Sequence, residues 1–151
     1  MLTLNIDYET GLKKLLSTLG RTQEAINKGK SKALRLSGLH MLRSIDTNFR
    51  AGGRPAWAPL KVATIARKGQ STILVQSGRL RASVTSTSSM KQSENELRIG
   101  TNLKYAPVHQ FGYPQKRIPK RAFLLFQKED VTIISKIFKD NITGEIKAKI
   151  Q

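Results

Sequence analysis

The residues with the greatest capacity for acid–base or metal chemistry in this chain are its two histidines, His40 and His109. A histidine acts as a base or ligand only beside a second reactive group. His40 and Asp46 lie six residues apart in a predicted helix, which places them on different faces. The sequence has no His-Glu-x-x-His arrangement, no Gly-Lys-Ser/Thr phosphate loop and no Gly-x-Ser-x-Gly turn. We therefore predict a protein without enzymatic activity, cofactor or metal.

His109 and Trp57 each allow two interpretations. His109 follows Tyr105 and precedes a cationic loop, so it is either a hydrogen-bonded residue that fixes this loop or a base or ligand. Trp57 stands between two prolines in a loop. A tryptophan buries a large area and its N–H can bond loop carbonyls, which favours a core or loop anchor; the alternative is a hot spot in an interface.

A basic loop follows Pro114 and carries Lys116, Arg117, Lys120 and Arg121. It has no interleaved aromatic residues of the kind that stack single-stranded bases, and no helix-turn-helix or zinc-finger pattern surrounds it. Sequence-specific reading of DNA is therefore not expected. The loop is a solvated basic face, or it contacts phosphates or acidic neighbouring subunits.

The overall charge points to a polyanionic neighbour. The 151 residues include 27 Lys and Arg against 10 Asp and Glu, a net charge of +17. Between Asp46 and Glu129 the only acids are Glu94 and Glu96, whereas fifteen basic residues lie between Arg50 and Lys128. Such a field favours nucleic acid or an acidic protein surface without specifying either.

The same composition limits the class of protein. The length suits one compact domain, and the hydrophobic fraction of 38% is that of a folded globular chain. The absence of cysteine excludes disulfides, thiol catalysis and Cys-based zinc sites. No apolar run approaches the roughly 20 residues of a membrane span, and no signal-peptide layout is present. We expect a cytoplasmic starting location and no membrane partner.

The positions of apolar residues predict helices at both ends of the chain. Leucines at helical spacing predict a short helix over Tyr8–Leu19 that Gly20 ends, followed by a long basic helix over Thr22–Arg50. Gly29 and Gly38 weaken this second helix by about 1 kcal/mol each, which predicts a kink or a close contact with a neighbour.

The remainder of the chain is a series of short elements. In chain order we predict a loop over Ala51–Leu60, a helix over Lys61–Lys68, an extended piece over Ser71–Gln76, a β-hairpin of Leu80–Met90 with Glu96–Thr101, one or two helical turns over Tyr105–Phe111, a strand over Ala122–Phe126, and a helix from Val131 to Ile142 with a frayed end beyond Thr143-Gly144.

These elements predict an α+β fold, in which two N-terminal helices and one C-terminal helix pack on a small antiparallel sheet. We expect one domain over residues 1–151. Its parts are a helical region (1–50), a loop with a short helix (51–76), a hairpin, basic loop and strand (77–126), and a terminal helix (127–151).

Several segments, in this order, resemble the phage virion morphogenesis family, the tail-completion proteins of Mu-like phages and prophages. The resemblance covers about two thirds of the chain. Its segments are Phe49 with Gly52–Leu60 and Thr64, Leu74–Leu80 with Ser83, Ile99–Thr101, Tyr105–Gly112 and Ile118–Leu124. The chain departs from the family pattern at Gly52–Pro55, and its middle is poorer in acids than the family requires.

The resemblance implies a structural part, without catalytic residues, that finishes the tail tube at its head-proximal end. Related neck and tail-completion proteins form rings, commonly hexameric, so the implied partners are copies of the chain, tail-tube proteins and head-connector proteins, with non-specific contact to genomic DNA in the channel. The implied locations are the host cytoplasm during assembly and then the virion. Within these segments we predict the interface or loop-anchor residues to be Trp57, Pro59, Leu60, Tyr105, His109, Gln110, Phe111 and Phe123.

A second function remains open at this point: a sequence-nonspecific nucleic-acid-binding module that uses the basic middle of the chain. A salt titration separates the two functions. The binding module predicts that the monomer binds duplex DNA with a steep salt dependence, whereas the structural protein predicts assembly and little binding as a monomer.

Overall fold

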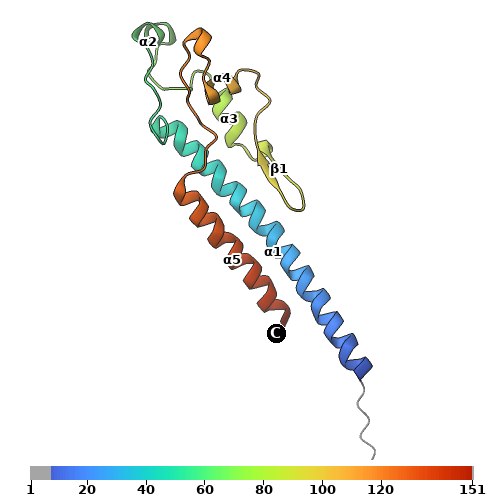
Figure 1. The fold of residues 1–151 in the computed structure, drawn as a ribbon. Coiled ribbons are helices and arrows are strands. Elements are labelled where there is room, and N and C mark those ends of the chain that lie inside the picture. Colours follow the sequence, from blue (N-terminus) through green and yellow to red (C-terminus); the bar gives the residue numbers. More distant parts are fainter. Residues whose placement is uncertain (1–7, 151) are drawn as a thin grey trace, which may run out of the picture.

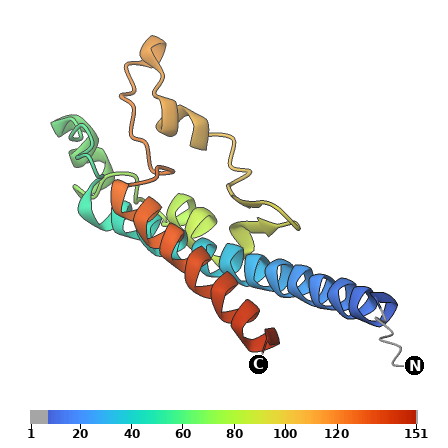
Figure 2. The ribbon, with the colours of Figure 1, turned by 60° about the horizontal axis from the view of Figure 1, so that its bottom comes forward.

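Two long helices form the frame of the molecule. The computed structural model describes residues 8–150, of which helix α1 spans Tyr8–Ala51 and helix α5 spans Lys128–Ile150. The two helices run side by side in opposite directions, and the short elements gather at the C-terminal end of α1 (Figure 1). The N-terminal part of α1 projects beyond α5 in both views (Figures 1 and 2). Within residues 8–150 no helix is long and apolar enough to cross a membrane.

Helix α1 buries a stripe of residues spaced four apart, because this spacing returns to nearly the same face of a helix. The stripe consists of Ala25, Gly29, Ala33, Ser37, Met41, Ile45 and Phe49, all of which are buried. Its first four members are small and its last three are large. The small half allows a close neighbour, and the large half supplies the core.

The predicted break at Gly20 is wrong, because α1 is one continuous helix rather than two. Nothing lies within 4 Å of the position that a Cβ on Gly20 would occupy. A glycine in a helix costs about 1 kcal/mol relative to alanine, which is too little to end a helix that both flanking segments favour. Residues 1–7 of the predicted helical region lie outside the described residues.

The predicted close contacts at Gly29 and Gly38 are confirmed. A Cβ on Gly29 would lie 2.8 Å from the Cα of Ile142 in α5, so glycine permits the approach of the two helix backbones. A Cβ on Gly38 would lie 2.8 Å from Cδ1 of Leu97 and 2.9 Å from Sδ of Met90. Gly29 therefore seats α5, and Gly38 seats the hairpin.

The C-terminal helix is confirmed and is longer than predicted. The predicted fraying beyond Thr143-Gly144 is wrong, because α5 continues to Ile150. Its last turns are linked to α1 by ion pairs, Lys28 Nζ to Glu145 Oε2 at 2.9 Å and Lys149 Nζ to Glu24 Oε2 at 3.1 Å. These contacts between distant segments were not visible in the apolar spacing.

The short elements confirm the predicted hairpin only in part. Strands β1 (Met90–Gln92) and β2 (Leu97–Ile99) pair antiparallel around the predicted turn. Most of the predicted first strand, Leu80–Met90, is instead helix α3 (Arg79–Thr85) followed by the 3-10 turn η1 (Thr87–Ser89). Leu80 and Val84 are four apart and both buried, so the helical spacing outweighs the β propensity of the Ser, Thr and Val residues.

The other short elements are helical. Helix α2 (Val62–Lys68) is confirmed, and Gly69 ends it in the left-handed conformation, with φ 73°. Helix α4 (Ala106–Phe111) confirms the predicted helical turns, and η2 (Pro114–Lys116) is a 3-10 turn within the basic loop. The predicted extended piece Ser71–Gln76 contains turns and no strand. Helices with one small antiparallel sheet make an α+β fold, as predicted.

The predicted strand Ala122–Phe126 is wrong: this segment pairs with side chains and not with another strand. Gln110 Oε1 accepts the N–H groups of Phe123 (3.0 Å) and Leu124 (3.1 Å), and Gln110 Nε2 donates to the Leu124 carbonyl at 2.9 Å. Trp57 Nε1 donates to the Ala122 carbonyl at 3.0 Å, and Asn48 Nδ2 donates to the Phe123 carbonyl. Because side chains satisfy these backbone groups, the segment needs no sheet.

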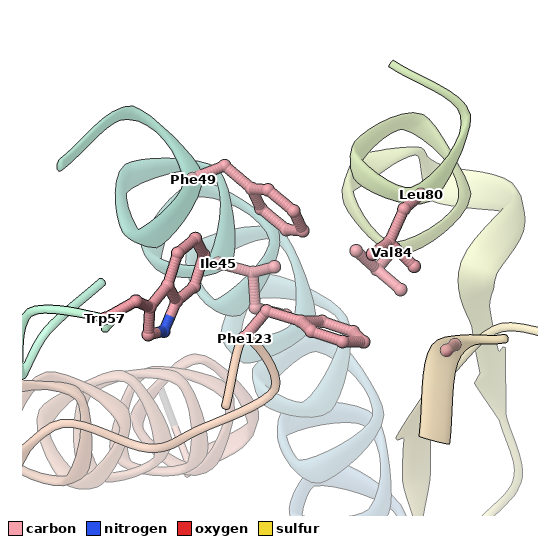
Figure 3. Close-up of a cluster of buried hydrophobic side chains, with 7 residues drawn as sticks. Ile45, Phe49, Trp57, Leu80, Val84 and Phe123 are labelled. Carbon is pink, nitrogen blue, oxygen red and sulfur yellow. The ribbon is translucent and has the colours of Figure 1, made fainter. Parts of the chain in front are cut away.

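The hydrophobic core lies where these segments meet α1 (Figure 3). The Phe49 ring packs edge-on against Trp57, with ring centroids 5.6 Å apart, and at a tilt against Phe123 at 5.7 Å. Leu80 and Val84 of α3 close the other side of the cluster. The core therefore fixes the segments on which the basic residues are carried.

A polar network joins the start of α5 to α1. The Asp130 carboxylate is buried and accepts hydrogen bonds from the Ser44 hydroxyl (2.8 Å) and the Gln127 backbone N–H (2.9 Å), and it lies 2.8 Å from His40 Nε2. Burial by itself raises the pKa of Asp130, but these hydrogen bonds together bring the pKa below its ordinary value. The bond to Gln127 also caps the helix. His40 therefore has a structural partner that lies 90 residues away.

Candidate functional site: a cationic pocket

A pocket of about 610 Å³ lies among α2, α4, the start of α3 and the basic loop. Three cations of the predicted basic loop line it: Lys116, Arg117 and Arg121. Four further cations reach it from other segments: Lys61, Arg67, Lys68 and Arg79. No acidic residue lines it. We call it the cationic pocket.

The sides of the pocket are built by local sequence features. Gly69 and Gly78 both adopt positive φ, which turns the chain sharply after α2 and again before α3. Leu74 between them also has a positive φ of 58° and packs against the core, and this packing offsets the strain of that conformation. The turns bring Lys68 of α2 and Arg79 of α3 to one pocket.

Arg121 is the most buried cation of the pocket, with 7% of its surface exposed. Its guanidinium donates to the carbonyl of Ala58 at 3.0 and 2.9 Å and to the carbonyl of Pro59 at 3.2 Å. Burial lowers the pKa of Arg121. Burial also lowers the pKa of Lys68 and of His109, and the charge of Arg121 lowers both further.

The charges of the pocket are uncompensated. Each acid whose side chain the structure describes already contacts a cation or His40: Glu24, Asp46, Glu94, Glu96, Glu129, Asp130, Asp140 and Glu145. None of these ion pairs includes any of the seven pocket cations. The described acids therefore pair with cations or with His40 elsewhere in the molecule, and the seven cations of the pocket have no carboxylate partner among them.

The structure separates the predicted site residues into three groups. Pro59, Leu60, Tyr105 and His109 line the cationic pocket, together with three of the four predicted basic residues; Lys120 lies outside it. Trp57, Phe123 and Gln110 hold the core and the segment after the basic loop, which agrees with the loop-anchor interpretation of Trp57. Phe111 stands apart, with 73% of its surface exposed. Interface roles for these residues stay predictions.

His109 holds the basic loop through its backbone rather than its ring. Its carbonyl accepts the Arg121 N–H at 2.8 Å, whereas its Nδ1 is buried without a hydrogen-bond partner in the described part of the chain. The Tyr105 ring packs edge-on against it, with centroids 6.2 Å apart. Within residues 8–150 no group of three or more His, Asp or Glu residues could hold a metal ion. No acid or second histidine lines the pocket beside His109.

Sequence reasoning missed four pocket residues, Lys61, Arg67, Lys68 and Arg79. The small number of acids in the middle of the chain predicted an excess of positive charge there. The structure shows that cations from this region meet at the pocket. No spacing rule joins residues 61–79 to residues 116–121, because the core and not the local sequence brings these segments together.

The protein is thus an α+β protein that presents a pocket of cationic binding groups. The model of the phage virion morphogenesis family matches residues 9–143, so the chain belongs to that family. The chain is also similar to the Mu-like prophage FluMu G protein 2 of Haemophilus influenzae, with 38% identity over 105 residues that cover 66% of this chain and 69% of the relative. No solved structure matches. The protein thus has a role in the assembly of the phage virion.

Proposed function

We propose that the protein is a non-enzymatic subunit that completes the phage tail and joins it to the head, by assembling into a ring at the head-proximal end of the tail. Membership of the phage virion morphogenesis family supports the general role. The ring, its expected hexameric state and the contacts with tail-tube and head-connector proteins are the proposed part. In this function the protein starts in the host cytoplasm and ends in the virion.

One observation carries the proposed self-assembly: an exposed aromatic side chain and an apolar groove occur on the same subunit. Phe111 is 73% exposed. A groove of about 320 Å³ between α1, β2 and α5 is lined by apolar residues, apart from Ser37 and Gly38, and Leu125 and Phe126 form part of it. Phe126 is 63% exposed. Phe111 does not line this groove.

These two features suit a ring. When a knob on one subunit enters a hole of a different kind on the next, the contact is head-to-tail, and a head-to-tail contact that closes makes a ring. Burying a phenylalanine side chain contributes about 1.5–3 kcal/mol, so such a knob is a sizeable part of a subunit contact. We place Phe111 of one subunit in the apolar groove of its neighbour.

Mixing variants tests this assignment. Phe111→Ser removes the knob, and Leu125→Lys places a charge in the groove, so each variant alone should lose the oligomer that the wild type forms. A mixture of the two should recover dimers and nothing larger, because only one intact contact can form. Leu19→Ser, at a residue 56% exposed in the N-terminal part of α1, is the control and should keep the wild-type mass.

The measurement is native mass spectrometry, followed by incorporation into tails in a lysate that lacks the wild-type protein. A wild-type protein that stays monomeric at high concentration and in tail-containing lysates would contradict the proposed ring. Oligomers that survive both Phe111→Ser and Leu125→Lys would retain the ring but reject this contact. Turnover of a substrate abolished by His109→Ala would reject the non-enzymatic role.

A further inference from the structure

The most unusual feature of the molecule outside the proposed self-contact is the cationic pocket, because its charge is costly for the fold. Seven Lys and Arg side chains converge with no acid among the residues that line the pocket. Burial lowers the pKa of Arg121, and burial together with the nearby charge of Arg121 lowers the pKa of Lys68. A nearly buried Arg121 without a carboxylate partner indicates a site that an anion completes.

The form of the pocket selects among anions. Leu60, Leu74 and Ile118 line it beside the cations, so a ligand there meets apolar side chains as well as charges. The pocket has a volume of about 610 Å³, which can hold a few side chains of a bound peptide. A single strand binds through stacked aromatic residues, and Tyr105 is the one Tyr, Phe or Trp in the lining.

The acids of a second copy whose side chains the structure describes are a poor source of the anion. Glu24, Asp46, Glu94, Glu96, Glu129, Asp130, Asp140 and Glu145 all have cationic or histidine partners within their own subunit. Transferring one of them to a neighbour's pocket would break an existing ion pair. Complementary charge is then more readily supplied by a different, acidic chain.

We propose that the cationic pocket binds an acidic peptide segment of another protein, in which two or more carboxylates flank an apolar side chain. One carboxylate reaches Arg121, which the carbonyls of Ala58 and Pro59 hold in place. The others contact exposed cations at the rim, such as Arg67 and Arg79. The expectation that the partner is a neighbouring protein of the virion rests on the proposed function. The chemistry by which the pocket would bind an acidic peptide does not depend on that function.

A labelled synthetic peptide tests the pocket directly. The probe is fluorescein-Glu-Asp-Leu-Glu-Asp, and binding to the full chain is followed by fluorescence polarisation at low and physiological salt. The double variant Arg67→Gln with Arg79→Gln should bind about tenfold more weakly. The matched control, Lys104→Gln with Lys139→Gln, removes two exposed cations outside the pocket and should bind within about twofold of wild type. The uncharged peptide Gln-Asn-Leu-Gln-Asn should not bind.

Three outcomes would overturn the proposal. Equal loss of binding in the two double variants would show that the peptide senses only net charge. Absence of binding to the wild type at low salt would reject the site. A duplex or single-stranded DNA probe that binds more tightly than the peptide, and is weakened selectively by the pocket variant, would assign the pocket to nucleic acid. Peptide binding by a protein that forms no ring would reject the proposed function and retain the pocket.

Discussion

Substituting alanine for Gly29 tests the account of how α1 and α5 are held together. Gly29 and Gly20 lie in the same helix, and the same substitution can be made at both positions. At Gly20 the added methyl group meets nothing within 4 Å. At Gly29 it would lie 2.8 Å from the Cα of Ile142 and 3.0 Å from the Asn141 carbonyl oxygen. The pair therefore separates helix propensity from helix packing.

The opposing effects can be given magnitudes. Alanine is favoured over glycine in a helix by about 1 kcal/mol, so Gly20→Ala should raise the free energy of unfolding by about that amount. At Gly29 the obstacle is backbone, which cannot rotate away, and the helices must separate by at least 0.6 Å to bring 2.8 Å to an ordinary 3.4 Å contact. Overpacking of this kind costs about 1–3 kcal/mol and also disturbs neighbouring contacts. After the helix-propensity gain of about 1 kcal/mol is subtracted, we expect Gly29→Ala to destabilise the protein by up to about 2 kcal/mol.

The assay is urea unfolding followed by circular dichroism at 222 nm, with thermal melting as a second measurement. The two variants should differ by the overpacking cost of about 1–3 kcal/mol, or several degrees in Tm, with Gly20→Ala the more stable. Gly38→Ala should fall between them, because the Leu97 and Met90 side chains it meets can move. If Gly29→Ala were as stabilising as Gly20→Ala, the close approach of α5 to α1 at this residue would be refuted.

Three further predictions concern single side chains. Trp57→Ala should lower stability by about 3 kcal/mol or more, measured by thermal melting; an unchanged Tm with lost assembly would place Trp57 in an interface instead. The lowered pKa of Asp130 means that its stabilisation is present above the ordinary carboxyl pKa of about 3.9 and is lost as pH falls through the lower folded-state value. Asp130→Asn should therefore flatten the acid limb of a curve of stability against pH. An unchanged acid limb would show that other groups cause the acid unfolding. Gln110→Ala should lower the free energy of unfolding in urea by about 2 kcal/mol, because it leaves the backbone N–H of Phe123 unpaired. The control Gln115→Ala, at an exposed position, should cost almost nothing. Equal effects of the two substitutions would contradict the role of Gln110.

Much of the fold could be predicted because the long helices and tight turns are local. The apolar spacing located α1 and α5, and Gly69 located the end of α2. Two of the mistakes, at Ala122–Phe126 and at α3, share one cause. Ala122–Phe126 has the composition of a strand, but its partners are Gln110, Asn48 and Trp57, which no local pattern joins to it. The same holds for α3, where burial against α1 decided between helix and strand.

For the candidate site, the sequence by itself determined that the middle of the chain carries an excess of positive charge and to which family the segments are similar, and it left open whether Trp57 is an anchor or part of an interface. Only the tertiary structure decided where that charge gathers. Lys68 and Arg79 are separated from Arg121 by more than forty residues, and each acid whose side chain the structure describes is held in an ion pair elsewhere. Charge is a property of composition, whereas its concentration in a pocket depends on long-range packing, and this is why the sequence predicted the first and not the second.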